Sequence, residues 1–238
     1  MIPRVRSAGI ALLAVLALAS PCLAGEGMGP GRGAIGGQIG GSKFWADQDY
    51  SEGSSSRLAF SGHYRYVVNR WLRWQVSPGF TWSGYSGSVT APVPDGHFPG
   101  ETSKRSNLVL LIPVSFQAQY LLHAGKWHYH LGAGPGVYRV WIQNHRLVLV
   151  DPVSFVKHRK LHAGVTAELG VERFLKALPS TSVEATVATH LVFSHNEEDY
   201  PLGYNSNLGV TELRIGANYY FDMSRLKRQP SSPPLPRR

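Results

Sequence analysis

The chain has 238 residues, 43% of them hydrophobic, with a formal net charge of +9 and one cysteine. This length permits one large domain or two small ones, and one cysteine excludes any disulfide within the chain. The surplus of positive charge fits an anionic partner, and lipid head groups or lipopolysaccharide fit it at least as well as nucleic acid does.

Residues 1–24 have the features of a secretory signal peptide. Arg4 and Arg6 precede an apolar run, SAGIALLAVLALA, and the small residue Ala24 suits cleavage after it. The run has about 13 residues, well short of the ~20 that cross a bilayer as a helix, so we expect no transmembrane helix in the mature chain. A lipid anchor on Cys22 is disfavoured because a proline precedes it. Cleavage after Ala24 would also remove the one cysteine, and export makes nucleic acid the poorer partner.

Beyond a short segment, residues 25–32, the chain alternates apolar and polar residues with a period of two, which is typical of β-strands. The predicted strands are Gly33 to Phe44, Arg57 to Val67, Leu72 to Ser83, Asn107 to Leu121, Trp127 to Trp141, Lys160 to Glu172, Ser182 to Ser194 and Leu208 to Phe221. Each strand is near or above the ~9 to 11 residues that a tilted strand needs to cross a membrane.

The connections between these strands alternate in length. Those after the first, third, fifth and seventh strands are long and rich in turn residues, whereas those after the second, fourth and sixth are short. Long loops on one side and tight turns on the other are typical of an outer-membrane barrel with both termini on the short-turn side. We therefore predict an all-β fold, an eight-stranded antiparallel up-and-down transmembrane β-barrel over residues 33–221. Its location would be a bacterial outer membrane, with both termini in the periplasm.

The polar faces of the strands indicate which side points inward. They are rich in Gly, Ser, Thr, Gln and His and carry few charges, which suits a crowded interior better than a water-facing exterior. A Lys or Arg that faces lipid near the midplane costs ~2 to 4 kcal/mol, so the charged residues are expected inside and paired. The predicted interior polar network consists of Arg65, Arg73, Glu168, Glu172, Glu184, Glu212 and Arg214. Because eight strands leave room only for side chains, this network predicts a plugged interior.

Aromatic residues gather near the strand ends, where amphipathic rings would lie at head-group depth. The expected girdle at the short-turn end consists of Tyr66, Trp71, Trp74, Tyr120, Trp127, Tyr129, Phe174, Tyr219 and Phe221. The expected girdle at the loop end consists of Phe44, Trp82, Tyr85, Trp141 and Phe193. The alternative is that these rings belong to an ordinary apolar core.

Two stretches resemble a known family. RIGANYYF, residues 214–221, is similar to the carboxy-terminal assembly signal of bacterial outer-membrane barrels, in which the matching positions are Arg214, Gly216, Tyr219 and Phe221. LLIPVSFQAQYLLHAGKWHYHLGAGPGVY resembles paired strands of the outer-membrane protein β-barrel domain family, which includes small eight-stranded opacity-type barrels. The resemblance implies recognition by the barrel assembly machinery. The family's final aromatic residue commonly ends the chain, whereas here residues 222–238 follow as a basic, proline-rich tail for which we expect disorder.

Three functions are compatible with such a barrel. The first is a non-enzymatic role in membrane structure, adhesion or surface binding through the extracellular loops. The second is a small channel for small or apolar solutes, since Gly132, Gly134 and Gly136 could leave space inside. The third is an enzyme, because THLVFSHNEEDY loosely resembles the His, Ser and Glu region of lipid A deacylases. The H-x-S pattern of that family is absent here, since Val192 stands two residues before Ser194 in place of a histidine. We therefore assign no catalytic residue.

We expect neither a metal nor a cofactor. His128 and His130 share one strand face, but two imidazoles are an incomplete ligand set for zinc, and hydrogen bonding in the interior explains them as well. The expected partners are therefore membrane lipids, lipopolysaccharide and the assembly machinery, with a monomer favoured.

Overall fold

The computed structural model describes residues 28–46, 54–85, 107–144, 147–148, 159–195 and 206–223. These residues form eight long strands and one two-residue strand: β1 (Arg32–Ala46), β2 (Arg57–Val67), β3 (Leu72–Tyr85), β4 (Asn107–Ala124), β5 (Trp127–Asn144), β6 (Leu147–Val148), β7 (Arg159–Leu175), β8 (Leu178–Val192) and β9 (Leu208–Asp222). The eight predicted strands are thus confirmed, with differences confined to their ends. The short strand β6 was not predicted. No helix among the described residues is long and apolar enough to cross a membrane.

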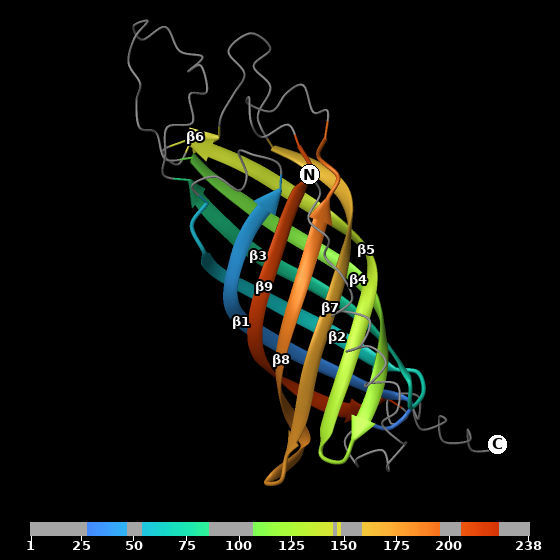
Figure 1. The fold of residues 1–238 in the computed structure, drawn as a ribbon. Coiled ribbons are helices and arrows are strands. Elements are labelled where there is room, and N and C mark those ends of the chain that lie inside the picture. The colour runs from blue at the N-terminus through green and yellow to red at the C-terminus, as the bar shows by residue number, and fades with distance from the viewer. Residues whose placement is uncertain are drawn as a thin grey trace, which may run out of the picture.

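The long strands pair with their neighbours in the chain and close into a barrel (Figure 1). Closure is completed by β1 and β9, which are antiparallel in continuous register from Arg32 opposite Asp222 to Ala46 opposite Leu208. The strand β6 only extends the end of β5. A closed barrel leaves no long strand with an unpaired edge, which is what a sheet in a membrane requires.

Tight hairpins join β2 to β3, β4 to β5 and β7 to β8 at one end of the barrel. In the first, the side-chain oxygen of Asn69 accepts hydrogen bonds from the backbone N–H groups of Trp71 and Leu72, at 2.8 and 2.9 Å. In the second, Gly125 has a φ of 61°, a left-handed conformation that glycine adopts without strain. These three connections define the hairpin end of the barrel, and the opposite end is the loop end.

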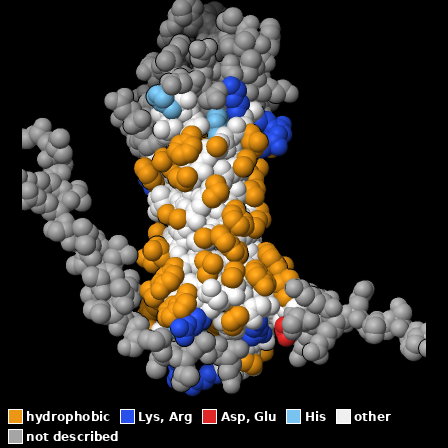
Figure 2. Space-filling view, turned by 90° about the vertical axis from the view of Figure 1, so that its right-hand side faces the viewer, with side chains coloured by type: hydrophobic (Ala, Val, Ile, Leu, Met, Phe, Trp, Pro, Cys, Tyr) orange, Lys and Arg blue, Asp and Glu red, His pale blue; other side chains and the backbone are white. Residues whose placement is uncertain are grey.

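The outer wall is apolar between two rims that carry basic side chains (Figure 2). On β9, for example, Leu213 and Ile215 are 64% and 63% exposed, and on β7 Leu161 is 69% exposed. Contiguous apolar surface of this extent would be insoluble in water but is what a lipid-facing barrel wall requires.

The barrel interior has three layers. At the loop end, nine apolar side chains form one buried cluster: Phe44, Val109, Leu111, Tyr138, Val140, Ile142, Val192, Leu208 and Val210. At the hairpin end, Met28, Ala34, Val67, Leu121 and Tyr220 form a second cluster. Charged and polar residues fill the space between them. The interior is therefore polar in its middle and apolar towards both ends.

Two of the aromatic residues expected in the girdles lie elsewhere. Phe44 is fully buried in the loop-end cluster, because its position on β1 has the inward phase. Phe174 packs against the rings of His128 and Tyr220 at the hairpin end. Other members are exposed on the outer wall as expected, including Tyr120 and Phe193, each 50% exposed. The side chain of Tyr85 lies outside the described residues.

Candidate functional site

The middle layer of the interior is the candidate functional site, because it contains every described arginine and glutamate that is buried. Its basic residues come from β2, β3 and β9, and its acidic residues from β7, β8 and β9. All seven residues of the predicted network lie there, at most 4% exposed.

Arg65 bridges β2 to β8. Its guanidinium donates two hydrogen bonds to the carboxylate of Glu184, at 2.7 and 3.1 Å, and a third to Gln75 at 2.5 Å. It also lies 3.8 Å from the carboxylate of Glu172. A fork-shaped donor that engages both oxygens of one carboxylate fixes the distance and the orientation of the two strands.

Arg73 pairs with Glu172 across the barrel, from β3 to β7, through a single guanidinium nitrogen. One of its nitrogens lies 2.9 Å from the carboxylate of Glu172 and donates to the hydroxyl of Tyr220 at 2.8 Å. The same carboxylate accepts hydrogen bonds from Tyr220 at 2.9 Å, from Asn218 at 3.0 Å and from Ser182. A fully buried carboxylate with this many donors is compensated for the loss of its water shell.

Arg214 completes the network near the loop-end cluster. Its guanidinium contacts Glu168 at 2.9 Å and Glu212 at 3.3 Å, and it donates to the hydroxyl of Ser61 at 2.9 Å. The side-chain amide of Gln119 donates to Glu168 at 3.0 Å. The network therefore reaches around the whole cross-section and has members on every long strand, including Gln38 on β1, which donates to Glu184 at 2.6 Å, and His130 on β5, which lies 3.3 Å from Glu168.

Three histidines lie beside the carboxylates. His130 is 3.3 Å from Glu168, His63 is 3.5 Å from Glu184, and His190 is 3.9 Å from Glu212. Three buried arginines face four buried glutamates, so these histidines lie in a layer that has one more acidic than basic side chain.

One group in this layer has the composition of a metal site. The ligand atoms of His130, Glu172 and Glu184 lie within 4.8 Å of one another. The two carboxylates already accept hydrogen bonds from Arg73 and Arg65, so a cation would have to compete with both guanidinium groups. The residues therefore fit an ion-pair network better than a metal centre.

His128 and His130, which share one face of β5, do not act together. The Nδ1 atom of His128 lies 2.7 Å from Nδ1 of His123, and Nε2 of His123 lies 2.8 Å from the backbone oxygen of Arg70. This histidine pair belongs to the hairpin end, whereas His130 belongs to the ionic layer.

The inward-facing glycines of β5 do not open a passage. A Cβ atom at Gly132 would lie 2.7 Å from the side chain of Gln119, and one at Gly136 would lie 2.6 Å from the hydroxyl of Tyr138. The space next to these two glycines is already occupied by neighbouring side chains.

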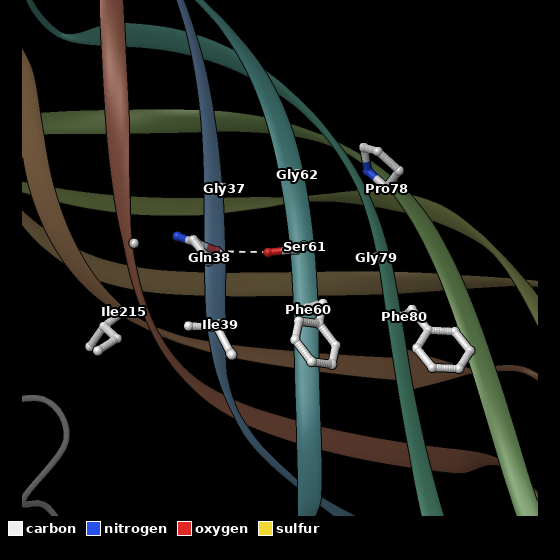
Figure 3. A pocket seen from close by; sticks show the side chains of 11 residues that line it. Gly37, Gln38, Ile39, Phe60, Ser61, Gly62, Pro78, Gly79, Phe80 and Ile215 are labelled. Carbon is white, nitrogen blue, oxygen red and sulfur yellow. Dashed lines mark hydrogen bonds between the residues drawn. The ribbon is translucent and has the colours of Figure 1, made fainter.

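A shallow groove of about 620 Å³ lies on the outer wall over β9, β1, β2 and β3 (Figure 3). Its floor follows a row of small residues in direct register, since Ala217 is opposite Gly37 and Gly37 is opposite Gly62. The β2–β3 pairing is interrupted next to this row, beside Pro78, which has no N–H to donate. Bulky side chains flank the row: Ile215, Ile39, Phe60 and Phe80. The groove faces outward, where acyl chains would fill it.

The four residues of the expected assembly signal lie on the closing strand β9. Arg214 points into the ionic layer, and Tyr219 is 55% exposed on the outer wall. Gly216 is inward-facing, and a Cβ atom there would lie 2.3 Å from the backbone oxygen of Gly37. Phe221 is opposite Gly33 on β1.

A closed wall with an apolar exterior and an ion-paired interior defines the chain as a small transmembrane β-barrel.

No protein-family model and no curated protein sequence matches it. Solved structures with a similar fold include the N-terminal β-barrel domain of OprF from Pseudomonas aeruginosa, with 11% identity over 81% of this chain and 99% of that chain and a TM-score of 0.45. Neisserial surface protein A has 16% identity over 79% of this chain and 97% of that chain, with a TM-score of 0.46. Ail, the attachment invasion locus protein of Yersinia pestis, has 14% identity over 81% and 99%, with a TM-score of 0.44. At such identities the likeness concerns the fold alone.

Proposed function

We propose that the protein is a non-enzymatic barrel of a bacterial outer membrane, a closed scaffold that presents its long loops to partners outside the cell. The observation that carries this proposal is the occupied interior. Arg65, Arg73 and Arg214 pair with acids across the barrel, and the loop-end cluster covers them. A site for partners is then left to the loops, which a rigid scaffold holds in place.

The orientation in the membrane belongs to the same proposal. The hairpin end would face the periplasm, as in outer-membrane barrels with short turns on that side, and the loop end would face outward. Residues 1–24 would direct export and be removed, and β9 would be recognised by the barrel assembly machinery. Protease added to intact cells should cut the chain only within the long loops, and cleavage at the hairpins instead would reverse the orientation.

A channel is the competing function, and conductance separates it from a closed scaffold. The purified full-length protein in planar bilayers should give no reproducible conductance step, because the ionic layer fills the narrow interior of an eight-stranded barrel and leaves no path for ions. Reproducible steps from the wild-type protein would refute the closed scaffold and favour passage of small solutes.

The geometry also disfavours a lipid A deacylase. His190 and Glu212 are both buried inside the barrel, and the hydroxyl of Ser194 donates to the backbone oxygen of Ser206 at 2.5 Å. A nucleophile and base that act on a lipid would have to face the membrane. Mass spectrometry of lipid A from cells that express the protein should show no loss of an acyl chain, and such a loss would revive the enzymatic function.

Surface binding itself is tested by shortening the loops while the barrel is kept. Replacing residues 88–103 by a short Gly-Ser linker should leave heat-modifiable gel migration unchanged, since no described contact depends on them, while adhesion of expressing cells to host cells or matrix falls. Unchanged adhesion after all four long loops have been shortened one at a time would contradict a loop-borne function.

A further inference from the structure

A tryptophan between two arginines marks a second site, on the outer wall at the loop end. Trp141 lies on β5, and Arg159 is directly opposite it on β7. The guanidinium of Arg159 is 4.5 Å from the centre of the Trp141 ring, and that of Arg139, two residues earlier on the same face of β5, is 5.1 Å from it. Two guanidinium groups thus contact the same ring.

These two cations have no acidic counterpart in the part of the chain that the structure describes. Four of the five described carboxylates, those of Glu168, Glu172, Glu184 and Glu212, are buried in the barrel. The fifth, Asp222, lies at the end of β9 that belongs to the hairpin side. Two guanidinium groups beside one ring repel each other unless an anion joins them.

The hairpin end provides a contrast. There Trp71 and Trp127 have one arginine each, since Arg70 is 4.8 Å from the ring of Trp71 and Arg173 is 5.0 Å from the ring of Trp127. Among the described cation–ring pairs, Trp141 is the only ring that has two arginines. A ring at head-group depth with one arginine is a general membrane anchor, whereas two arginines beside one ring offer twice as many N–H donors to an anion.

We propose that Arg139, Trp141 and Arg159 form a binding site for a phosphate group of lipid A, the membrane anchor of lipopolysaccharide. Guanidinium groups bind phosphate through paired N–H donors, and the two groups here would share one phosphate above the edge of the ring. The apolar wall below, on which Val137 is 47% and Leu161 69% exposed, would contact the acyl chains. The identity of the lipid rests on the proposed orientation, in which this rim meets the outer leaflet. The assignment of a phosphate site does not depend on that orientation.

The test is a binding titration of the full-length protein in zwitterionic detergent micelles with diphosphorylated lipid A. The double variant Arg139→Gln with Arg159→Gln should bind about 25-fold more weakly, at about five-fold for each arginine near a lipid surface. Lipid A with both phosphates removed should bind the wild-type protein no better than it binds the double variant. Heat-modifiable migration shows that each variant is folded.

The matched control replaces the arginines at the hairpin end, Arg70→Gln with Arg173→Gln, and removes the same total charge. It should bind lipid A within about two-fold of the wild type once salt screens the general field. Equal losses in the two double variants would overturn the site in favour of general electrostatic attraction. If inorganic phosphate at the same concentration as lipid A displaces it completely, the ligand is free phosphate and the assignment to lipid A is wrong. Neither result would bear on the closed scaffold, which conductance tests separately.

Discussion

Replacement of Arg65 tests the ionic layer most sharply. Its guanidinium is completely buried and holds the carboxylate of Glu184 with two hydrogen bonds, at 2.7 and 3.1 Å. Methionine has a similar length but no charge, so Arg65→Met would leave a buried carboxylate without its main partner. Breaking a buried ion pair on one side costs ~3 to 5 kcal/mol, and we expect the free energy of unfolding to fall by that amount.

The double variant Arg65→Met with Glu184→Met separates the pair from its surroundings. Removal of both charges should recover most of the loss, because two apolar side chains of similar volume avoid the cost of desolvating ions. The recovery should be incomplete by ~1 to 3 kcal/mol, since Gln75 and Gln38 would lose the hydrogen bonds that they make with Arg65 and Glu184.

Urea unfolding of the refolded protein in lipid vesicles, followed by tryptophan fluorescence, measures these free energies. Arg57→Met is the matched control, because Arg57 is an exposed arginine on the same strand, and its replacement should cost less than ~1 kcal/mol. If Arg65→Met costs no more than this control, the interior must be hydrated and the argument for a closed barrel fails.

Three further results are expected. Gly40→Ala should destabilise the barrel by ~1 to 3 kcal/mol in the same urea assay, because the new Cβ would lie 1.9 Å from the backbone oxygen of Leu213. Gly37→Ala, where the nearest such atom is 3.8 Å away, should change stability by less than ~0.5 kcal/mol, and equal effects would contradict the packing. Ile215→Lys should cost ~2 to 4 kcal/mol in lipid vesicles and much less in detergent micelles, and the reverse order would exclude a lipid-facing position. Phe221→Ala should reduce the heat-modifiable fraction in the outer membrane, whereas deletion of residues 224–238 should not, and impaired insertion after the deletion alone would place the signal in the tail.

The strands and their faces could be predicted because both depend on a period of two, which the sequence displays directly. The seven charged residues of the network share the inward phase of their strands, so their burial also followed from the pattern. Which arginine meets which glutamate could not be predicted. The partner of Arg65 is on β8, with four long strands between it and β2 in chain order, and depends on how the strands are staggered around the barrel.

The error at Phe44 has a physical reason. Its place near the end of a strand and its aromatic ring predict a girdle residue, although its phase on β1 is inward. Residue type identifies the lipid side only where the interior is polar, and at the loop end the interior is as apolar as the wall. The phase of Gln38 and Ser42, both buried on the same strand, would have given the correct side.

The position of the charges along the chain bears on how the barrel can be assembled. Two of the three network arginines, Arg65 and Arg73, are on the early strands β2 and β3. The glutamates with which they pair come much later in the chain, 119 residues after Arg65 and 99 residues after Arg73. A partly inserted sheet of the first strands would expose unpaired guanidinium groups to lipid. The guanidinium groups find their partners only when the late strands arrive and β9 meets β1. By this argument, insertion of the completed barrel would cost less than insertion one hairpin at a time.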